Sequence, residues 1–159
     1  MKNRINFTFP ALLTALVFIM LCLSTQAEAR IWSEKKLDKA ILKIDRELTR
    51  KRWDKVIARS QKAIPQCIAR HGETNQMCII MLRNINRSYE ETRRFNPNHS
   101  QIESAYTLAT QVFGKAHSTT VKTRDYYYKF LIFTENYAPA IPLVKEIIAL
   151  EEAGPGDEY

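Results

Sequence analysis

Residues 108–120 read LATQVFGKAHSTT and contain a glycine that has counterparts at a fixed distance on both sides. Gly114 lies midway along the chain between Gly72 and Gly156, and the whole sequence has only four glycines. One spacing among so few glycines is typical of a repeated unit that uses the same loop in each copy. The sequence therefore predicts an array of repeats about 42 residues long.

A second series of residues has the same period. The aromatic residues Trp53, Phe95 and Tyr137 are separated by the same interval as the glycines. Apolar residues in 37–48 recur at i, i+4, i+7 and i+11, which is the stripe of an amphipathic helix. Each unit is therefore expected to contain a first helix, a short turn, a second helix led by the aromatic residue, and a loop with the glycine.

The helix pattern and the prolines predict six helices. The expected ranges are 34–49, 53–69, 76–92, 99–112, 119–134 and 138–152. Pro97 is expected in a turn before the fourth helix, and Pro139 in the first turn of the last, where a missing N–H costs little. Pro65 and Pro142 fall further inside their helices and are expected to bend or interrupt them.

The third unit carries a resemblance to a known family. The loop with Gly114 and His117, and the helix start with Tyr137 and Ala140, resemble the 42-residue tetratricopeptide repeat of kinesin light chains. The second unit matches less well, because Asn98 stands where that family has a small alanine. The resemblance concerns the repeat type and implies nothing about a motor.

The resemblance implies a fold class. We expect an all-α protein, a right-handed α-solenoid of about three helical hairpins, in residues 30–159. The expected units are 34–72, 76–114 and 118–156. A single hairpin cannot bury its apolar stripe alone, so neighbouring hairpins stack and share one core. No polar capping helix follows the third unit, so self-association at this C-terminal repeat is one expectation and a self-sufficient last helix is the other.

Residues 1–29 have the features of a signal peptide. Two basic residues precede an almost unbroken apolar run at 9–23, and small residues follow at Ala27 and Ala29. The run is short for a membrane span, which needs about 20 residues. We expect export to a periplasm or to the outside of a cell, with cleavage after Ala27 or Ala29; an uncleaved anchor is the alternative.

Two cysteines remain after such a cleavage. Cys67 and Cys78 flank the Gly72 loop almost symmetrically, one near the end of a helix and the other near the start of the next. Antiparallel helices place such positions within the usual distance for a disulfide, which an oxidising compartment permits. The sequence predicts a bridge between the first two units, with two buried free thiols as the alternative.

Four cations are candidates for a binding groove. In the repeat class that the chain resembles, the exposed side of each unit's first helix lines an inner groove. Arg83 and Arg87 lie one turn apart on such a helix, and Lys122 and Lys129 share a face of the next one. Together they are expected to bind a carboxylate of a peptide, the arginines by paired hydrogen bonds. The alternative is a solvated charged face.

Two further groove residues follow from the resemblance. Asn84 stands where the family commonly has an asparagine that contacts a peptide. Tyr126 is the equivalent residue of the next unit and is expected to provide an aromatic contact, whereas Tyr128 is expected in the core.

The expected function is the binding of another protein or peptide, possibly an acidic one, without catalysis. The net charge of +7 also permits an anionic non-protein ligand such as a lipid head group, a polysaccharide or nucleic acid, although few aromatic residues accompany the cations. His71, His99 and His117 are far apart and have no metal-binding spacing. These histidines are the only residues that would support an enzymatic function. We therefore expect no catalytic residue, no cofactor and no metal.

Overall fold

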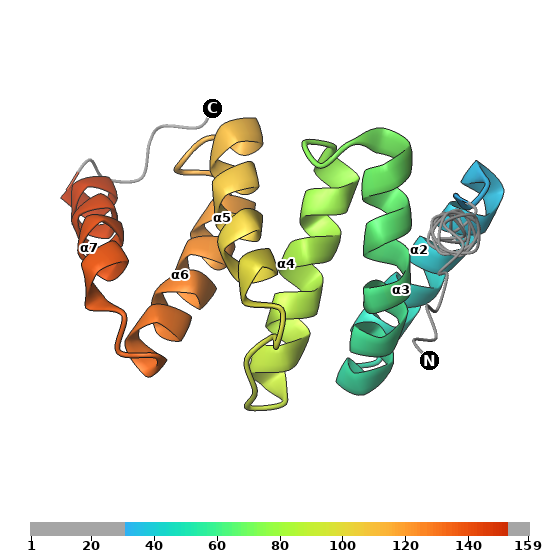
Figure 1. The fold of residues 1–159 in the computed structure, drawn as a ribbon, viewed down its shortest axis with the longest axis horizontal. Helices are drawn as coiled ribbons and strands as arrows, with labels where there is room; N and C mark the ends of the chain where they lie inside the picture. The colour runs from blue at the N-terminus through green and yellow to red at the C-terminus, as the bar shows by residue number, and fades with distance from the viewer. Residues whose placement is uncertain (1–30, 153–159) are drawn as a thin grey trace, which may run out of the picture. The chain divides into compact units, whose positions relative to one another are not determined.

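The computed structural model describes residues 31–152, which are built from helices with no strand among them. The helices are α2 (Glu34–Thr49), α3 (Trp53–His71), α4 (Gln76–Glu91), α5 (His99–Phe113), α6 (Ser118–Phe133) and α7 (Tyr137–Glu152) (Figure 1). The predicted all-α class is confirmed. The predicted signal peptide lies outside the described residues.

The period of the glycines is present in the helix boundaries. The first helix of each unit begins at Glu34, Gln76 or Ser118, which are separated by that same interval, and each of the three is 16 residues long. Gly72 and Gly114 end α3 and α5 with φ of 84° and 83°, where a side chain would be strained. The two glycines therefore occupy the same loop position in the first and second units.

A second turn also recurs with this period, without glycine. Lys51, Arg93 and Glu135 follow α2, α4 and α6, and have φ of 52°, 56° and 56°. In the first of these turns the backbone N–H of Arg52 donates to the carbonyl of Glu47 at 2.9 Å, and the other two turns have the equivalent bond at the same length. The backbone of this turn is thus the same in all three units although its residues differ.

The second unit has a longer turn between its helices. α3 and α7 begin at the aromatic residue of the period, but α5 begins at His99, four residues after Phe95. Pro97 disfavours helical backbone at the residue before it, which delays the helix. The ring of Phe95 instead packs against those of Phe130 and Phe133, with centroids 5.7 Å and 4.9 Å away.

Of the two effects expected at Pro65 and Pro142, a bend or an interruption of the helix, the interruption is wrong. α3 continues through Pro65 and α7 through Pro142. Each proline costs one backbone hydrogen bond. Burial of apolar neighbours offsets this cost, since Ile64 is fully buried and Leu143 is 5% exposed.

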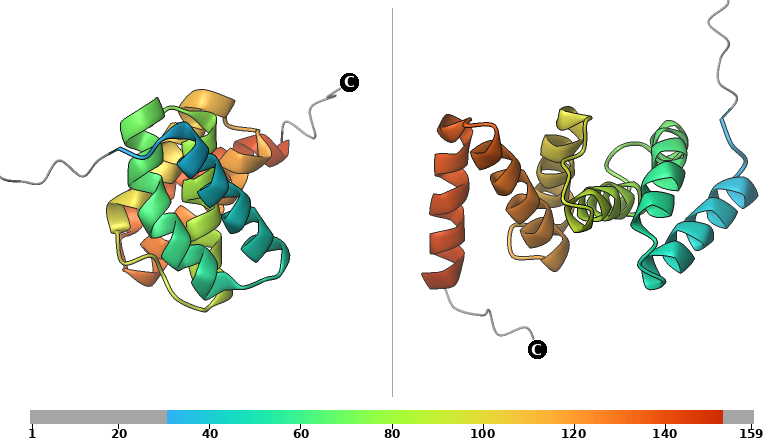
Figure 2. Two further views of the ribbon diagram at one scale, coloured as in Figure 1. Left: turned by 90° about the vertical axis from the view of Figure 1, so that its right-hand side faces the viewer. Right: turned by 90° about the horizontal axis from the view of Figure 1, so that it is seen from below.

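Helices that follow one another in the chain pack side by side, from α2 at one end to α7 at the other (Figures 1 and 2). Among the described helices, α4 and α6 are the one pair that packs together without being consecutive. Each is the first helix of its unit. This contact creates a shared surface between the second and third units, while the right-handed sense of the array stays a prediction.

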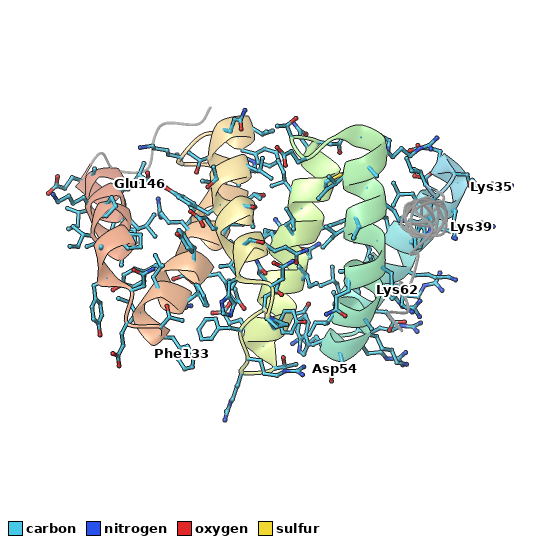
Figure 3. All side chains as sticks on the ribbon, viewed as in Figure 1. Lys35, Lys39, Asp54, Lys62, Phe133 and Glu146 are labelled. Atoms are coloured by element: carbon cyan, nitrogen blue, oxygen red, sulfur yellow. A yellow bond between two sulfur atoms is a disulfide. The ribbon has the colours of Figure 1, made fainter. Side chains whose placement is uncertain are left out.

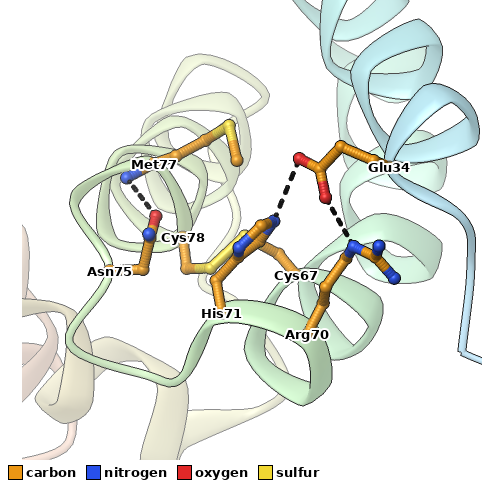
Figure 4. The surroundings of a disulfide bond; sticks show 7 residues. All are labelled: Glu34, Cys67, Arg70, His71, Asn75, Met77 and Cys78. Carbon is orange, nitrogen blue, oxygen red and sulfur yellow. Dashed lines mark hydrogen bonds and ion pairs between the residues drawn. A yellow bond between two sulfur atoms is a disulfide. The ribbon is translucent and has the colours of Figure 1, made fainter.

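The predicted disulfide is present between the first two units (Figure 4). Cys67 and Cys78 have Cα atoms 5.7 Å apart, and both side chains are fully buried. Beside the bridge, the carboxylate of Glu34 pairs with Nε2 of His71 at 3.3 Å and with Arg70. These contacts hold the start of α2 against the end of α3.

None of the helices within residues 31–152 has the length and apolarity required to cross a membrane.

Candidate functional site

A pocket of about 280 Å³ lies between α4 and α6. From α4 it is lined by Arg83, Asn86, Arg87, Glu90 and Glu91, and from α6 by Lys122, Thr123, Asp125 and Tyr126. The structure therefore brings together four of the six residues predicted for a groove. The other two, Asn84 and Lys129, do not line the pocket.

Arg83 is a half-buried cation that has neutral partners. Its Nε and Nη2 donate to Oδ1 of Asn84 at 3.2 Å and 2.9 Å, and its Nη1 donates to Oγ1 of Thr119 at 3.2 Å. Among the described residues no carboxylate pairs with it within 4.0 Å. Burial and the nearby charge of Arg87 lower the pKa of Arg83, which remains a cation at any physiological pH.

Asn84 positions this arginine and is not exposed to a ligand. Its side chain is 7% exposed, and its amide oxygen accepts both hydrogen bonds from Arg83. The amide oxygen of Asn84 is therefore used within the protein, and the peptide contact that the resemblance implied for Asn84 stays a prediction. Because the bonds come from a neighbour on the same helix, they fix the direction of the guanidinium.

The sequence analysis missed Asn86, a buried donor in the same pocket. Its side chain is 2% exposed, and its Oδ1 accepts a bond of 2.9 Å from Nδ2 of Asn96. The Nδ2 of Asn86 has no hydrogen-bond partner among the described residues. A buried amide N–H without a partner is costly, so a ligand acceptor at this place would be favoured. No pattern in the sequence points to Asn86 as a residue of this pocket.

Lys129, predicted as a free cation, is already paired. Its Nζ lies 2.7 Å from Oε1 of Glu90 and 2.7 Å from Oδ2 of Asp125. Hydrogen bonds to Asp125 and then to Glu90 raise the pKa of Lys129. The pocket lining itself has three basic and three acidic side chains, so it is of mixed charge and not basic throughout.

The remaining cations differ in how free they are. Arg87 lies 3.6 Å from the carboxylate of Glu91, with its guanidinium 5.6 Å from the centre of the Trp53 ring. Lys122 is exposed and forms no ion pair within the described part of the chain. Arg83 and Lys122, on opposite walls, are therefore the pocket cations without a carboxylate partner in residues 31–152.

Tyr126 forms part of the pocket floor. Its side chain is 2% exposed, and its hydroxyl accepts a bond of 3.1 Å from the backbone N–H of Asn96. Burial raises the pKa of Tyr126 to about 12. The aromatic contact that we expected is thus limited to whatever part of the ring the pocket exposes. Tyr128 is half-buried and packs against the core, as expected.

The three histidines have separate structural surroundings. His71 pairs with Glu34, His99 lies 4.7 Å from the ring of Phe130, and Nδ1 of His117 accepts the N–H of Thr119 at the start of α6. Within residues 31–152 no three His, Cys, Asp or Glu side chains cluster in a way that suits a metal ion.

Comparison with known proteins adds no assignment: no protein-family model matches the chain, and no curated protein matches it. What the chain does has to be inferred from its own residues.

Proposed function

We propose that this chain is an exported helical-repeat protein of the tetratricopeptide type, and that it binds a peptide segment of another protein in the α4–α6 pocket. The regular recurrence of helix starts and turns supports the repeat type. The pocket lies between the first helices of two units, where this repeat type has its groove. The Cys67–Cys78 bridge agrees with an oxidising compartment.

The proposal depends on Arg83. Removing a guanidinium from water is costly unless a counter-charge compensates, and the described residues provide only neutral acceptors. Three of its N–H groups are used by Asn84 and Thr119. A guanidinium has five, so two remain for a ligand, one on each terminal nitrogen. A ligand carboxylate would satisfy both and supply the missing charge.

Two neighbouring groups extend this contact. Lys122 on the α6 wall adds a second, flexible cation close to the carboxylate. The Nδ2 of Asn86 is buried and has no partner in the described residues, so it would gain a hydrogen bond if a small shift of its side chain let a backbone carbonyl of the same peptide reach it. A peptide with a carboxylate followed by ordinary backbone can bind to Arg83, Lys122 and Asn86. A simple anion can bind only to the two cations.

The acidic part of the pocket restricts the ligand. Glu90, Glu91 and Asp125 lie toward the C-terminal side of Arg83 and Lys122 along their helices, and their charges are offset by Lys129 and Arg87. A second acidic residue of the ligand would face these carboxylates at a cost. We therefore expect a ligand with one carboxylate near Arg83 and neutral or basic residues beyond it.

A defined peptide tests the proposal. Selection from a random peptide library on the immobilised protein should give a recurring sequence with one Glu, Asp or terminal carboxylate. Titration calorimetry of that peptide should then show that Arg83→Gln weakens binding about tenfold to a hundredfold, the range for a hydrogen-bonded charge. Lys145→Gln, on exposed α7, is the matched control and should leave the affinity unchanged.

A change in the peptide completes a double-mutant cycle with Arg83→Gln. Replacing its carboxylate by an amide should weaken binding to the wild type, but should have little further effect on Arg83→Gln. Equal affinity of the wild type and Arg83→Gln, with the same helical circular dichroism, would remove the α4–α6 pocket from the proposal.

A further inference from the structure

Positive charge is concentrated in the first hairpin of the described chain. Residues 31–62 contain 11 Lys and Arg against 5 Asp and Glu, a net charge of +6. Residues 63–159 contain 10 basic and 11 acidic residues, a net charge of −1. Within residues 31–159 the excess of positive charge thus belongs to the first hairpin, that is, to α2, the turn after it and the first half of α3, and not to the α4–α6 pocket.

A groove of about 270 Å³ lies between α2 and α3 at this end of the molecule. Its lining consists of Trp32, Lys36, Lys39, Ala40, Lys43, Arg59 and Lys62, with no acidic residue. Figure 3 shows Lys39 and Lys62 among the side chains at this end, opposite to Phe133 and Glu146. Five cations therefore surround one hollow.

Four of these five cations have no ion-pair partner in the part of the chain that the structure describes. Within residues 31–152, Arg59 is the lining residue with an ion pair, at 3.5 Å from Glu47, and it shares that carboxylate with Arg52 at 3.6 Å. The lysines of the groove form none. By contrast, Lys129 beside the other pocket has two carboxylates at 2.7 Å. Uncompensated like charges around one groove repel each other, and an anion there would remove that cost.

Trp32 is the aromatic residue of the groove lining, and its backbone is anchored to α3. The backbone N–H of Trp32 donates to Oε1 of Gln66 at 2.8 Å, and its carbonyl accepts a bond of 3.0 Å from Nη1 of Arg70. These bonds hold Trp32, two residues before the start of α2, against α3. The ammonium of Lys36 lies 4.3 Å from the centre of the indole ring, which keeps this lysine at the groove.

The spacing of the lysines selects an extended anion. Lys36, Lys39 and Lys43 follow one another at intervals of three and four residues on α2, so their backbone positions span roughly 10 Å along the helix. A small anion would have to draw the three ammonium groups together against their mutual repulsion, whereas an extended anion can contact them along the helix. Lysine is a compact point charge that binds phosphate well and does not require the planar, paired geometry that arginine provides.

We propose that the α2–α3 groove is a second binding site, separate from the peptide pocket, for a ligand that carries several phosphate groups close together. Its volume suits a soluble polyphosphate compound or a phosphorylated lipid head group, which present the same chemistry. Single-stranded nucleic acid is less well matched, because it binds to successive aromatic platforms and this groove has one, beneath Lys36.

The indole of Trp32 provides the signal for a test. The chain has two tryptophans, so Trp53→Phe leaves Trp32 as the sole tryptophan emitter. Sodium tripolyphosphate titrated into this protein should change the Trp32 emission to saturation. A second titration uses vesicles of phosphatidylcholine with cardiolipin, with vesicles of phosphatidylcholine alone as the control. Binding of tripolyphosphate indicates a soluble ligand and binding of the cardiolipin vesicles a lipid; either result supports the site.

Two charge-matched double variants separate a site from diffuse attraction. Lys39→Gln with Lys43→Gln removes two groove lysines, and Lys51→Gln with Lys55→Gln removes two exposed lysines of the same hairpin outside the groove. We expect the groove variant to bind tripolyphosphate or cardiolipin vesicles at least tenfold more weakly, and the control to stay within about twofold of the parent. Arg83→Gln should bind them as the parent does, whatever its effect on peptides.

The proposal would be overturned if neither probe changed the Trp32 emission to saturation, or if both double variants bound the probes equally weakly. It would also be overturned if a single-stranded oligonucleotide bound more tightly than the probes and the two double variants lost equal affinity for it. The last two would assign the charge to general attraction of polyanions.

Discussion

Arg124 of α6 and Glu146 of α7 form an ion pair of 3.2 Å whose side chains are 7% and 10% exposed. Lys115 also reaches the same carboxylate at 3.0 Å, and the hydroxyl of Tyr106 donates to it at 3.2 Å. The last helix is therefore held to α5 and α6 by one acidic residue. In backbone packing, α6 is the neighbour of α7 among the described helices.

We expect Glu146→Gln to reduce the free energy of unfolding by about 2 kcal/mol, because it leaves the buried Arg124 without a counter-charge. Urea unfolding followed by circular dichroism measures this loss. Glu152→Gln, on the exposed end of the same helix, is the control and should change stability by less than about 0.5 kcal/mol. Similar losses for both variants would contradict the role of the buried pair.

The same carboxylate predicts a pH dependence. Burial alone would raise the pKa of Glu146, but hydrogen bonds from Lys115 and Arg124 outweigh it and keep the pKa below its ordinary value. A carboxyl whose pKa is lowered by folding stabilises the fold at neutral pH, and this contribution is lost as the pH falls through the folded pKa. The stability difference between wild type and Glu146→Gln should thus shrink below about pH 4. A difference independent of pH would be inconsistent with an ionised Glu146.

The disulfide should stabilise the stack measurably. Closing the short loop between Cys67 and Cys78 is worth about 2–3 kcal/mol on the chain-entropy model. Thermal unfolding with and without a reducing agent should show a lower transition temperature for the reduced protein. Mass spectrometry of the non-reduced protein should find a linked Cys67–Cys78 peptide, and free thiols on both residues would refute the bridge.

A glycine in the recurrent turn that lacks one should stabilise the protein. Lys51 has φ of 52°, a left-handed backbone conformation that is unfavourable for a residue with a side chain. Its side chain forms no hydrogen bond or ion pair in the described structure that would compensate. We expect Lys51→Gly to stabilise the protein by about 0.5–1 kcal/mol, after the entropic cost of glycine. Gly72→Ala, at φ of 84°, is the opposite change and should destabilise it. Denaturant midpoints of the two variants check both signs.

The outer face of α7 predicts weak self-association. Tyr137, Ile141 and Ile148 are 56%, 55% and 48% exposed on this helix. In sedimentation velocity, the sedimentation coefficient should increase with protein concentration. The double substitution Ile141→Lys with Ile148→Lys should abolish this increase. Leu42→Lys, at a 64% exposed leucine of α2, is the matched control. A monomer at all concentrations would mean that the last helix is self-sufficient.

The helix boundaries could be predicted closely because their signals are local. The spacing of apolar residues and the positions of Gly72 and Gly114 act within one or two turns of backbone, so the expected α3 ended only two residues early. Pro65 was the misleading local signal, because core packing of its neighbours outweighs one lost hydrogen bond. The disulfide was predictable for a related reason, since both cysteines flank a single loop.

The sequence alone determined the all-helical class, the length of the repeated unit and four of the residues that line the pocket, because each follows from periodic spacing along one chain. Only the tertiary structure decided which charges are free. Lys129 lies 39 residues from Glu90, with which it pairs, while Arg83 is left with neutral partners and the groove lysines with none in the described chain. Such differences depend on which helices pack together and on how deeply each side chain is withdrawn from water, and both are properties of the assembled fold.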